Sequence, residues 1–212
     1  MKTKHIPFFP NTLDDTHCYQ AALRMVLKYF LPDKEFTFEE LDKITAKKEG
    51  LWTGTTEGII SLHAMDFDVI DMDGFEIDQF IKKGGEYLVA KYGEEVGREQ
   101  IKHIDIEHEI ALNKKYLPLD IHTTVVPTLD TIKNLLDKNY LVICNVNANA
   151  LNNEEGYTGH FIVIFEYDEK GFSLHDPGLP PRPDRYIHYE DFKKAWQYPT
   201  EESSNLLALR YH

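Results

Sequence analysis

Apolar and polar residues alternate with a helical period near the start of the chain. In DDTHCYQAALRMVLKYF, apolar or nearly apolar side chains recur at Cys18, Ala21, Ala22, Met25, Val26 and Tyr29. That spacing is typical of a helix that buries one face. Asp14, Asp15 and Thr16 are residue types that favour the N-cap position. The helix is therefore predicted to begin near Thr16, with Cys18 in its first turn.

Helical patterns continue through most of the first two thirds of the chain. The only strand predicted there is FDVIDMD, at 67–73. The predicted helices cover 37–47, 54–65, most of 75–115, and 128–139.

The final third has the pattern of a sheet. YLVICNVN (140–147) and HFIVIFEY (160–167) are nearly continuous apolar runs, as expected of strands that are buried on both faces. GFSLHDPG (171–178) and NLLALRYH (205–212) are predicted as further strands, separated by a helix at 188–198. Helices first and a sheet afterwards indicate an α+β fold.

The register between the second and third of these strands can be predicted from their side chains. In one register, apolar side chains face apolar side chains and an acid faces a base: Ile164 faces Phe172, Ile162 faces Leu174, and Glu166 faces Lys170. A shift by two residues would place Ile162 opposite Asp176. The preferred register instead places His160 opposite Asp176, and we expect the ring to donate its Nδ1–H to this carboxylate. Nε2 would then be free.

A cysteine at the start of a helix is a candidate nucleophile. The positive end of the helix stabilises a thiolate, although Cys18 could also be a small core residue. A nucleophilic thiol needs a base, and the base needs an orienting group. His17 is a poor base for Cys18, because consecutive helix residues point about 100° apart. His160 is a better candidate, since it follows Gly159 and opens a rigid strand.

Composition narrows the class of protein. The chain has 212 residues, which suits one domain, and a net charge of −13, which argues against a nucleic-acid partner and disfavours an anionic membrane. No apolar run approaches the ~18 residues of a membrane helix, and MKTKHIPFFP is too short for a signal peptide. Two cysteines form no disulfide framework. We therefore expect a cytoplasmic protein, and its oligomeric state stays open.

A metal site is the rival chemistry, and the sequence gives it little support. His103 and His108 are five residues apart, which does not align them on one helix face. No cysteine pair has zinc spacing, and Cys144 lies in a predicted buried strand. We expect neither a metal nor another cofactor.

Three short sequence motifs, in this order along the chain, resemble those of the C39-like branch of the papain-like cysteine peptidases. They are CYQAALRMVLKYF, GHFIVIFEYDEKGFSLHDPG and YEDFKKAW. His160 follows Cys18 by 142 residues, and Asp176 follows His160 by 16, which is the papain-like order and approximate spacing. The resemblance covers about 30 N-terminal and 60 C-terminal residues. The unmatched middle, about 75–115, would be a helical insertion in a single domain spanning 1–212.

The resemblance implies a papain-like fold, with N-terminal helices packed on a C-terminal antiparallel sheet. It also implies a cysteine peptidase or amide hydrolase that forms an acyl-enzyme on a peptide or amide substrate. Cys18 would attack the carbonyl, His160 would act as base and then acid, and Asp176 would orient the ring. An acyltransferase with the same triad, or a degenerate papain-like binding module, is the alternative.

Two positions depart from the family pattern. The residue after the nucleophile is Tyr19, where the family has Gly. The family also places an oxyanion-hole Gln about six residues before the cysteine, and here that position is Thr12. Asn11 is the nearest amide, and we expect it to point toward the space beside the Cys18 thiol and to donate the missing hydrogen bond.

Overall fold

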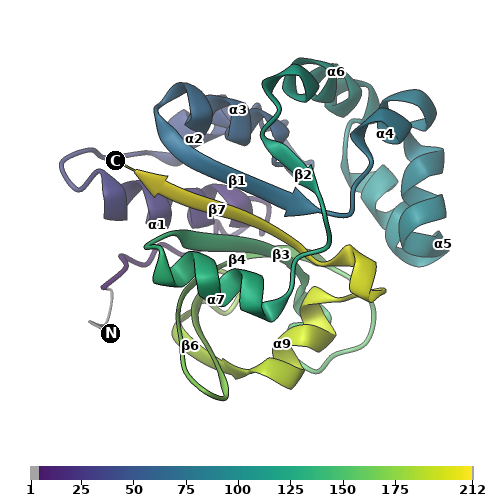
Figure 1. Ribbon diagram of the computed structural model, residues 1–212. Helices are drawn as coiled ribbons and strands as arrows, with labels where there is room; N and C mark the ends of the chain where they lie inside the picture. Colours follow the sequence, from purple (N-terminus) through teal and green to yellow (C-terminus); the bar gives the residue numbers. More distant parts are fainter. Residues whose placement is uncertain (1–4, 212) are drawn as a thin grey trace.

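A seven-stranded sheet forms the centre of the molecule (Figure 1). The computed structural model describes residues 5–211. The strand order is β2-β1-β7-β3-β4-β5-β6, and every neighbouring pair is antiparallel except β1 and β2. The strands are β1 (Phe67–Asp73), β2 (His122–Thr124), β3 (Leu141–Asn147), β4 (Gly159–Tyr167), β5 (Gly171–Asp176), β6 (Arg182–His188) and β7 (Asn205–Tyr211).

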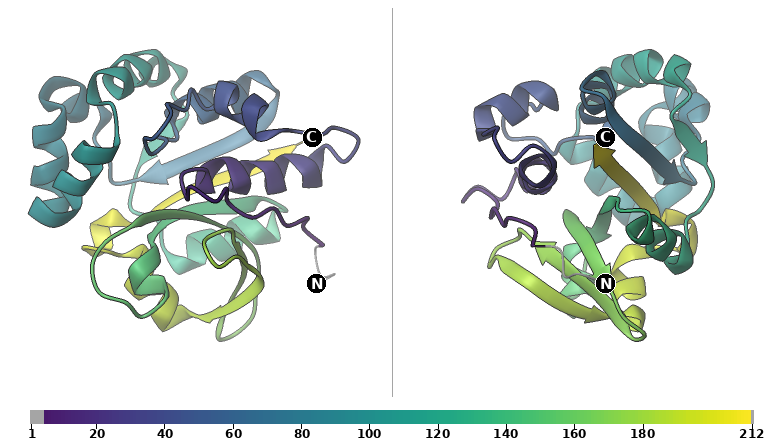
Figure 2. Two further views of the ribbon diagram at one scale, coloured as in Figure 1. Left: turned by 180° about the vertical axis from the view of Figure 1, so that it is seen from behind. Right: turned by 60° about the vertical axis from the view of Figure 1, so that its left-hand side comes forward.

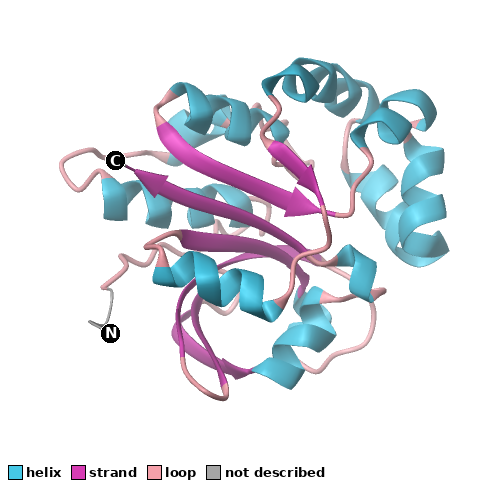
Figure 3. Cartoon of the chain, viewed as in Figure 1, coloured by secondary structure: helices cyan, strands magenta, loops and turns pink. Residues whose placement is uncertain are grey.

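Nine α-helices within residues 5–211 surround the sheet (Figure 3). Two short 3₁₀ turns, Leu117–Leu119 and Glu201–Ser203, complete the regular structure there. The helices are α1 (Cys18–Phe30), α2 (Phe38–Ile44), α3 (Thr56–Ala64), α4 (Ile77–Lys83), α5 (Gly85–His103), α6 (Ile106–Tyr116), α7 (Leu129–Asp137), α8 (Ala148–Leu151) and α9 (Tyr189–Trp196).

Helices cover both faces of the sheet, which explains the continuous apolar runs. Successive β4 side chains point to opposite faces. Phe161 and Val163 belong to the core beneath α1, whereas Ile162 and Ile164 belong to the core beneath α7 and α9. Figure 2 shows α1 on the face opposite to the α7 face of Figure 1. A strand buried on both sides needs apolar residues at every position.

The predicted α+β class is confirmed, and so are most predicted elements. The first helix begins at Cys18 rather than near Thr16. The predicted strand 205–212 is observed as Asn205–Tyr211, and His212 lies outside the described residues. Two strands, β2 and β6, were not predicted. The β6 sequence RPDRYIH has no apolar pattern because it is an exposed edge strand, where polar residues and proline are tolerated.

The predicted register between β4 and β5 is wrong. Ile164 pairs with Leu174 rather than with Phe172, and continuing this register brings Ile162 opposite Asp176. A bulge between Ile164 and Glu166 inserts one residue into β4. Beyond the bulge, Phe172 pairs with Tyr167 instead. The bulge lets apolar residues match on both sides of it, which a regular ladder cannot do.

Helix α5 is a pair of helical segments that fold against each other. Gly93 has a φ of 80°, a left-handed conformation that glycine adopts without strain, and it breaks the helix in the middle. Gly97 lies where the two segments touch. A Cβ atom on Gly97 would lie 2.6 Å from the Cα of Val89 and 2.7 Å from the carbonyl oxygen of Leu88. Only glycine allows this close approach.

Gly97→Ala is therefore expected to destabilise the protein by about 2 kcal/mol, because the added methyl group meets backbone atoms that cannot rotate away. Urea unfolding measures the change. Glu86→Ala, at an exposed position of the same helix, is the control and should stay within ~0.5 kcal/mol of the wild type. An unchanged unfolding midpoint for Gly97→Ala would contradict the packing of the two segments.

Candidate active site

Cys18 is the first residue of α1, and its side chain is half-buried. The inner face of the helix packs on the sheet through three fully buried residues, Ala22, Leu23 and Val26. The backbone N–H of Cys18 has no hydrogen-bond partner within residues 5–211. The thiol is thus fixed at the positive end of a rigid helix, beside an unused backbone donor.

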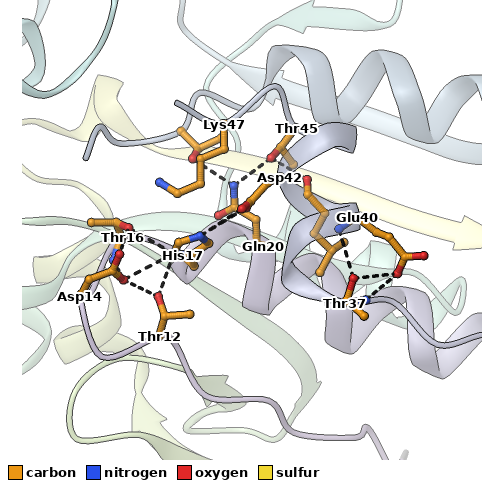
Figure 4. Close-up of polar contacts among 12 residues, drawn as sticks. Thr12, Asp14, Thr16, His17, Gln20, Thr37, Glu40, Asp42, Thr45 and Lys47 are labelled. Atoms are coloured by element: carbon orange, nitrogen blue, oxygen red, sulfur yellow. Dashed lines mark hydrogen bonds and ion pairs between the residues drawn. The ribbon is translucent and has the colours of Figure 1, made fainter. Parts of the chain in front are cut away.

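The loop before α1 is held by a polar network around His17 (Figure 4). Thr12 Oγ1 lies 2.8 Å from His17 Nδ1, and Asp42 Oδ1 lies 3.3 Å from His17 Nε2. The ring also packs edge-on against Phe38. These contacts occupy both ring nitrogens and connect the start of α1 to α2. His17 therefore has a structural role, as its position next to Cys18 had indicated.

His160 and Asp176 form a buried hydrogen-bonded pair. His160 Nε2 lies 2.8 Å from Asp176 Oδ1, and the two residues are only 5% and 4% exposed. Cys18 lies close enough to His160 to influence its ring, and both residues line the same cavity. Because Nε2 contacts Asp176, the nitrogen left for Cys18 is Nδ1. The sequence-based prediction had assigned the two nitrogens the other way round, with Nδ1 on Asp176 and Nε2 free.

The surroundings of this pair favour the charged forms of both groups. Burial lowers the pKa of His160, but the hydrogen bond from its ring to Asp176 and the influence of Cys18 outweigh burial and raise the pKa to about 10. Burial raises the pKa of Asp176, but the hydrogen bond and the charge of His160 bring it down to about 2. An imidazolium between a carboxylate and a sulfur atom is the result at neutral pH.

Arg185, on β6, holds the outer oxygen of the same carboxylate. Its Nη1 lies 2.7 Å from Asp176 Oδ2, and Nη1 also donates to Asn152 Oδ1 at 3.1 Å. Nη2 donates to the carbonyl oxygen of Leu151 at 2.5 Å. Gly178 N–H donates to Asp176 Oδ1 at 3.0 Å. The sequence analysis missed Arg185, because a polar edge strand gives no pattern that marks one arginine among its neighbours.

Removing this guanidinium should impair orientation of the base without unfolding the chain. Arg185→Met keeps the apolar stem but leaves Asp176 Oδ2 without its donor, and we expect kcat to fall about thirtyfold, which corresponds to ~2 kcal/mol. KM should change little, and the acidic limb of the pH–rate profile should move to higher pH, because the arginine lowers the pKa of Asp176. Steady-state kinetics from pH 4 to 9 test this.

The matched control is Asp184→Asn, next to Arg185 on the same strand, where the side chain is 81% exposed. This variant should keep wild-type kinetics. Equal losses in kcat for Arg185→Met and Asp184→Asn, with no shift of the pH profile, would assign Arg185 to the strand structure alone.

Asn11 does not have the orientation that was predicted. Its Oδ1 accepts hydrogen bonds from the backbone N–H groups of Thr12, at 2.8 Å, and His17, at 2.9 Å. Its Nδ2 donates to Asp15 Oδ1 at 2.7 Å. The segment does lie beside the site, since Asn11 N–H donates to the carbonyl oxygen of Pro177. The amide, however, fixes the loop that leads into α1, because two unpaired backbone donors there need an acceptor.

A cavity of about 470 Å³ opens at Cys18 and His160. Three aromatic residues, Trp52, Tyr157 and Tyr198, form part of its wall. The ring centroids of Tyr157 and Tyr198 stack at 5.9 Å, and Trp52 stacks at 4.5 Å on His103 behind it. Trp52 and Tyr157 meet edge-to-face, and Tyr157 packs against Gly159. The cavity continues to the segment 71–122, which includes the helices that the sequence analysis had left unmatched. No cluster of metal-ligating side chains occurs within residues 5–211.

Comparison with protein families decides the affiliation of the chain. The model of the Peptidase_C39 like family matches residues 3–204. The chain belongs to this family. Membership of this family agrees with the resemblance of the three sequence motifs. It makes a peptidase-type hydrolase the expected class of activity. A search of curated proteins finds no match for the C39-like chain.

Solved structures show that the fold is the papain-like fold of C39 peptidase domains. The peptidase domain of Streptococcus ComA, a bi-functional ABC transporter involved in a quorum-sensing pathway, superposes with a TM-score of 0.55 at 11% identity, covering 98% of this chain and 100% of that one. A double glycine motif protease from an AMS/PCAT transporter, in complex with a leader peptide, gives 0.51 at 13% identity, covering 99% and 94%. A protein from Bacillus anthracis described as a C39-like peptidase gives 0.50 at 16% identity, covering 99% and 96%.

The transporter-associated relatives raise the question of a membrane segment in this C39-like chain. None of the helices in residues 5–211 combines the length and the apolar character that crossing a bilayer requires.

Proposed function

We propose that this C39-like protein is a cysteine hydrolase that cleaves a peptide or related amide bond through an acyl-enzyme on Cys18. The observation that carries the proposal is the hydrogen bond between His160 and Asp176 at the cavity that Cys18 also lines, with the thiol at the start of a helix and the base buried beside a carboxylate. The peptide substrate draws support from the AMS/PCAT protease, which was solved with a leader peptide. The unmatched helices of 75–115 would be an insertion within a single domain.

The reaction needs one nucleophile and one group that moves a proton. The Cys18 sulfur attacks the carbonyl carbon, and the resulting oxyanion accepts a hydrogen bond from the Cys18 backbone N–H. His160 donates its Nδ1 proton to the leaving amine, so that the C–N bond breaks and a thioester remains. Water then attacks the thioester while Nδ1 accepts its proton, and the carboxylic acid leaves. Asp176 keeps the ring oriented throughout and stabilises it whenever it carries the proton.

Trapping the acyl-enzyme tests this function. We expect a library of peptidyl coumarin amides to contain members that add an acyl group to the protein, detected by intact mass after acid quenching and mapped to Cys18 by peptide mass spectrometry. Cys144 is an internal control, because it is fully buried and burial raises its pKa, so it should carry no adduct.

The same experiment separates hydrolysis from acyl transfer. Adding a primary amine should divert the thioester to a new amide only if the protein accepts an amine in place of water. The proposal fails if no library member acylates Cys18 and if iodoacetamide alkylates Cys18 no faster than a free thiol in solution. That result would favour a binding module with an inactive triad.

A further inference from the structure

The cavity at Cys18 extends along the loop 52–56 to α6, where Glu109 forms part of its wall. Thr53, Gly54 and Thr55 line the path between them. The Glu109 carboxylate packs directly against Gly54: a Cβ atom there would lie 2.5–2.7 Å from the carboxylate atoms. The backbone N–H of Gly54 also donates to Glu109. The loop and the helix thereby hold this carboxylate at a fixed place on the wall.

Within the described part of the chain, Glu109 lacks the ion pairs with a histidine that Asp71 and Asp73 of the same wall form with His122. The Asp71 carboxylate accepts a hydrogen bond from Tyr116 at 2.7 Å and lies 3.0 Å from His122 Nδ1. Asp73 Oδ1 accepts a hydrogen bond from the N–H of Phe75. Within residues 5–211, Glu109 forms no ion pair, and burial raises the pKa of its carboxyl to about 7.

The cation that acts on Glu109 is already paired with another carboxylate. The charge of Lys48 does act on this carboxyl, but Lys48 Nζ lies 2.5 Å from Asp105 Oδ2 and forms its ion pair there. Asp105 itself adds a repulsive negative charge near Glu109. A half-buried carboxylate with a neighbouring anion and no cation of its own is costly for the protein unless a ligand supplies the positive charge.

The rest of the wall suits the same kind of ligand. Trp52, the residue two positions before Gly54, presents an aromatic ring to the cavity, and so does Tyr157. Aromatic faces attract cations and pack against the methylene stem of a lysine or arginine side chain. An apolar side chain of the same length would pack on the rings equally well but would leave Glu109 uncompensated.

We propose that Glu109 is a specificity-determining residue, which selects substrates that carry a lysine or arginine side chain near the scissile bond. The proposal rests on the proposed cysteine hydrolase function, because it concerns the substrate of the same site. The ammonium or guanidinium group would lie at the Glu109 carboxylate, its aliphatic stem would run along Trp52 and the loop 52–56, and the scissile carbonyl would lie at Cys18.

Activity-based probes can test this on the whole chain. A set of dipeptidyl acyloxymethyl ketones would carry lysine, arginine, norleucine or glutamate, either at the residue bearing the ketone or at the one before it. Norleucine matches the lysine stem without its charge. We expect the lysine or arginine probes to label Cys18 at least about tenfold faster than the norleucine probe at one of these positions, measured by intact mass over time.

Glu109→Gln should reduce this ratio to within about twofold, because the neutral amide keeps the shape of the side chain but not its charge. Glu107→Gln, on the exposed side of the same helix, is the matched control and should keep the wild-type ratio. Glu109→Lys should reverse the preference toward the glutamate probe, and thermal unfolding of each variant verifies that it is folded.

The possible failures are distinguishable. If norleucine and lysine probes label the wild type equally fast, or if the preference survives in Glu109→Gln, Glu109 does not determine specificity while the cysteine hydrolase stands. If no probe labels Cys18, the proposed cysteine hydrolase function is wrong, and so is the proposed substrate class.

Discussion

Replacing Cys18 by alanine is expected to lower the turnover of a cognate amide by about 10⁴-fold or more. The reason is that the thiolate makes the only covalent bond to the substrate in the proposed reaction. Without the thiol, His160 and Asp176 cannot form the acyl-enzyme. Substrate hydrolysis at saturating concentration, together with intact mass after quenching, measures both turnover and the missing adduct.

Cys144→Ala is the control for loss of a thiol. Cys144 lies in β3, in the core beneath α7 and α9, so this variant should lose some stability and keep its turnover. If the Cys18→Ala protein hydrolyses the substrate as fast as the Cys144→Ala protein, the nucleophile is a different residue.

Asp176→Asn is expected to lower kcat by about 10²–10⁴-fold, since the amide no longer stabilises the imidazolium and no longer fixes one tautomer of His160. Asp176→Ala should in addition cost about 3–5 kcal/mol of stability, because it leaves the guanidinium of Arg185 in a buried place without its carboxylate. Kinetics and urea unfolding of the two variants separate catalysis from stability.

The pH dependence gives this prediction a second readout. The folded-state pKa of Asp176 is lowered from 3.8 to about 2, so the carboxylate contributes stability above about pH 4 and loses it as the pH falls toward 2. The contribution amounts to about 2 kcal/mol. The stability gap between wild type and Asp176→Asn should therefore narrow by about that amount between pH 6 and pH 2. A gap that stays constant would mean that the charge of Asp176 does not stabilise the fold.

The histidine titrates at the opposite end of the pH scale. The pKa of His160 is raised from 6.5 to about 10, so its interaction with Asp176 contributes fully below about pH 6.5 and is lost as the pH rises through 10. The charged pair is consequently complete between about pH 4 and pH 9.

The sequence predicted those parts of the fold in which the hydrophobic pattern decides the structure. The buried runs at 140–147 and 160–167 were recognised as strands, and the amphipathic pattern after Cys18 as a helix. Edge strand β6 was missed, since its residues face water and their pattern carries no burial signal. The β4–β5 register was missed because a bulge changes the pairing halfway along, and a bulge adds a residue without leaving a mark in the hydrophobic pattern.

The sequence allowed the residues of the candidate site to be predicted better than their geometry. Cys18, His160 and Asp176 were chosen from their order and their local motifs, and in the structure His160 pairs with Asp176 at a cavity that Cys18 also lines. The ring nitrogens were assigned wrongly, because a sequence does not show which edge of the imidazole ring faces Asp176. Asn11 was chosen by sequence distance alone, which could not reveal that two backbone donors would occupy its oxygen. The contacts of Arg185 and Glu109 depend on tertiary packing, so no local pattern marks them.

Cys18 is far in the sequence from His160 and Asp176, and this separation has a consequence during synthesis. Cys18 leaves the ribosome with the first helix, but its base and the carboxylate follow only after another 142 and 158 residues. The N-terminal arm is also joined to the last part of the site, through Asn11 N–H and the carbonyl oxygen of Pro177. A growing chain therefore carries an unpartnered thiol until residue 176 has been made and the site has folded.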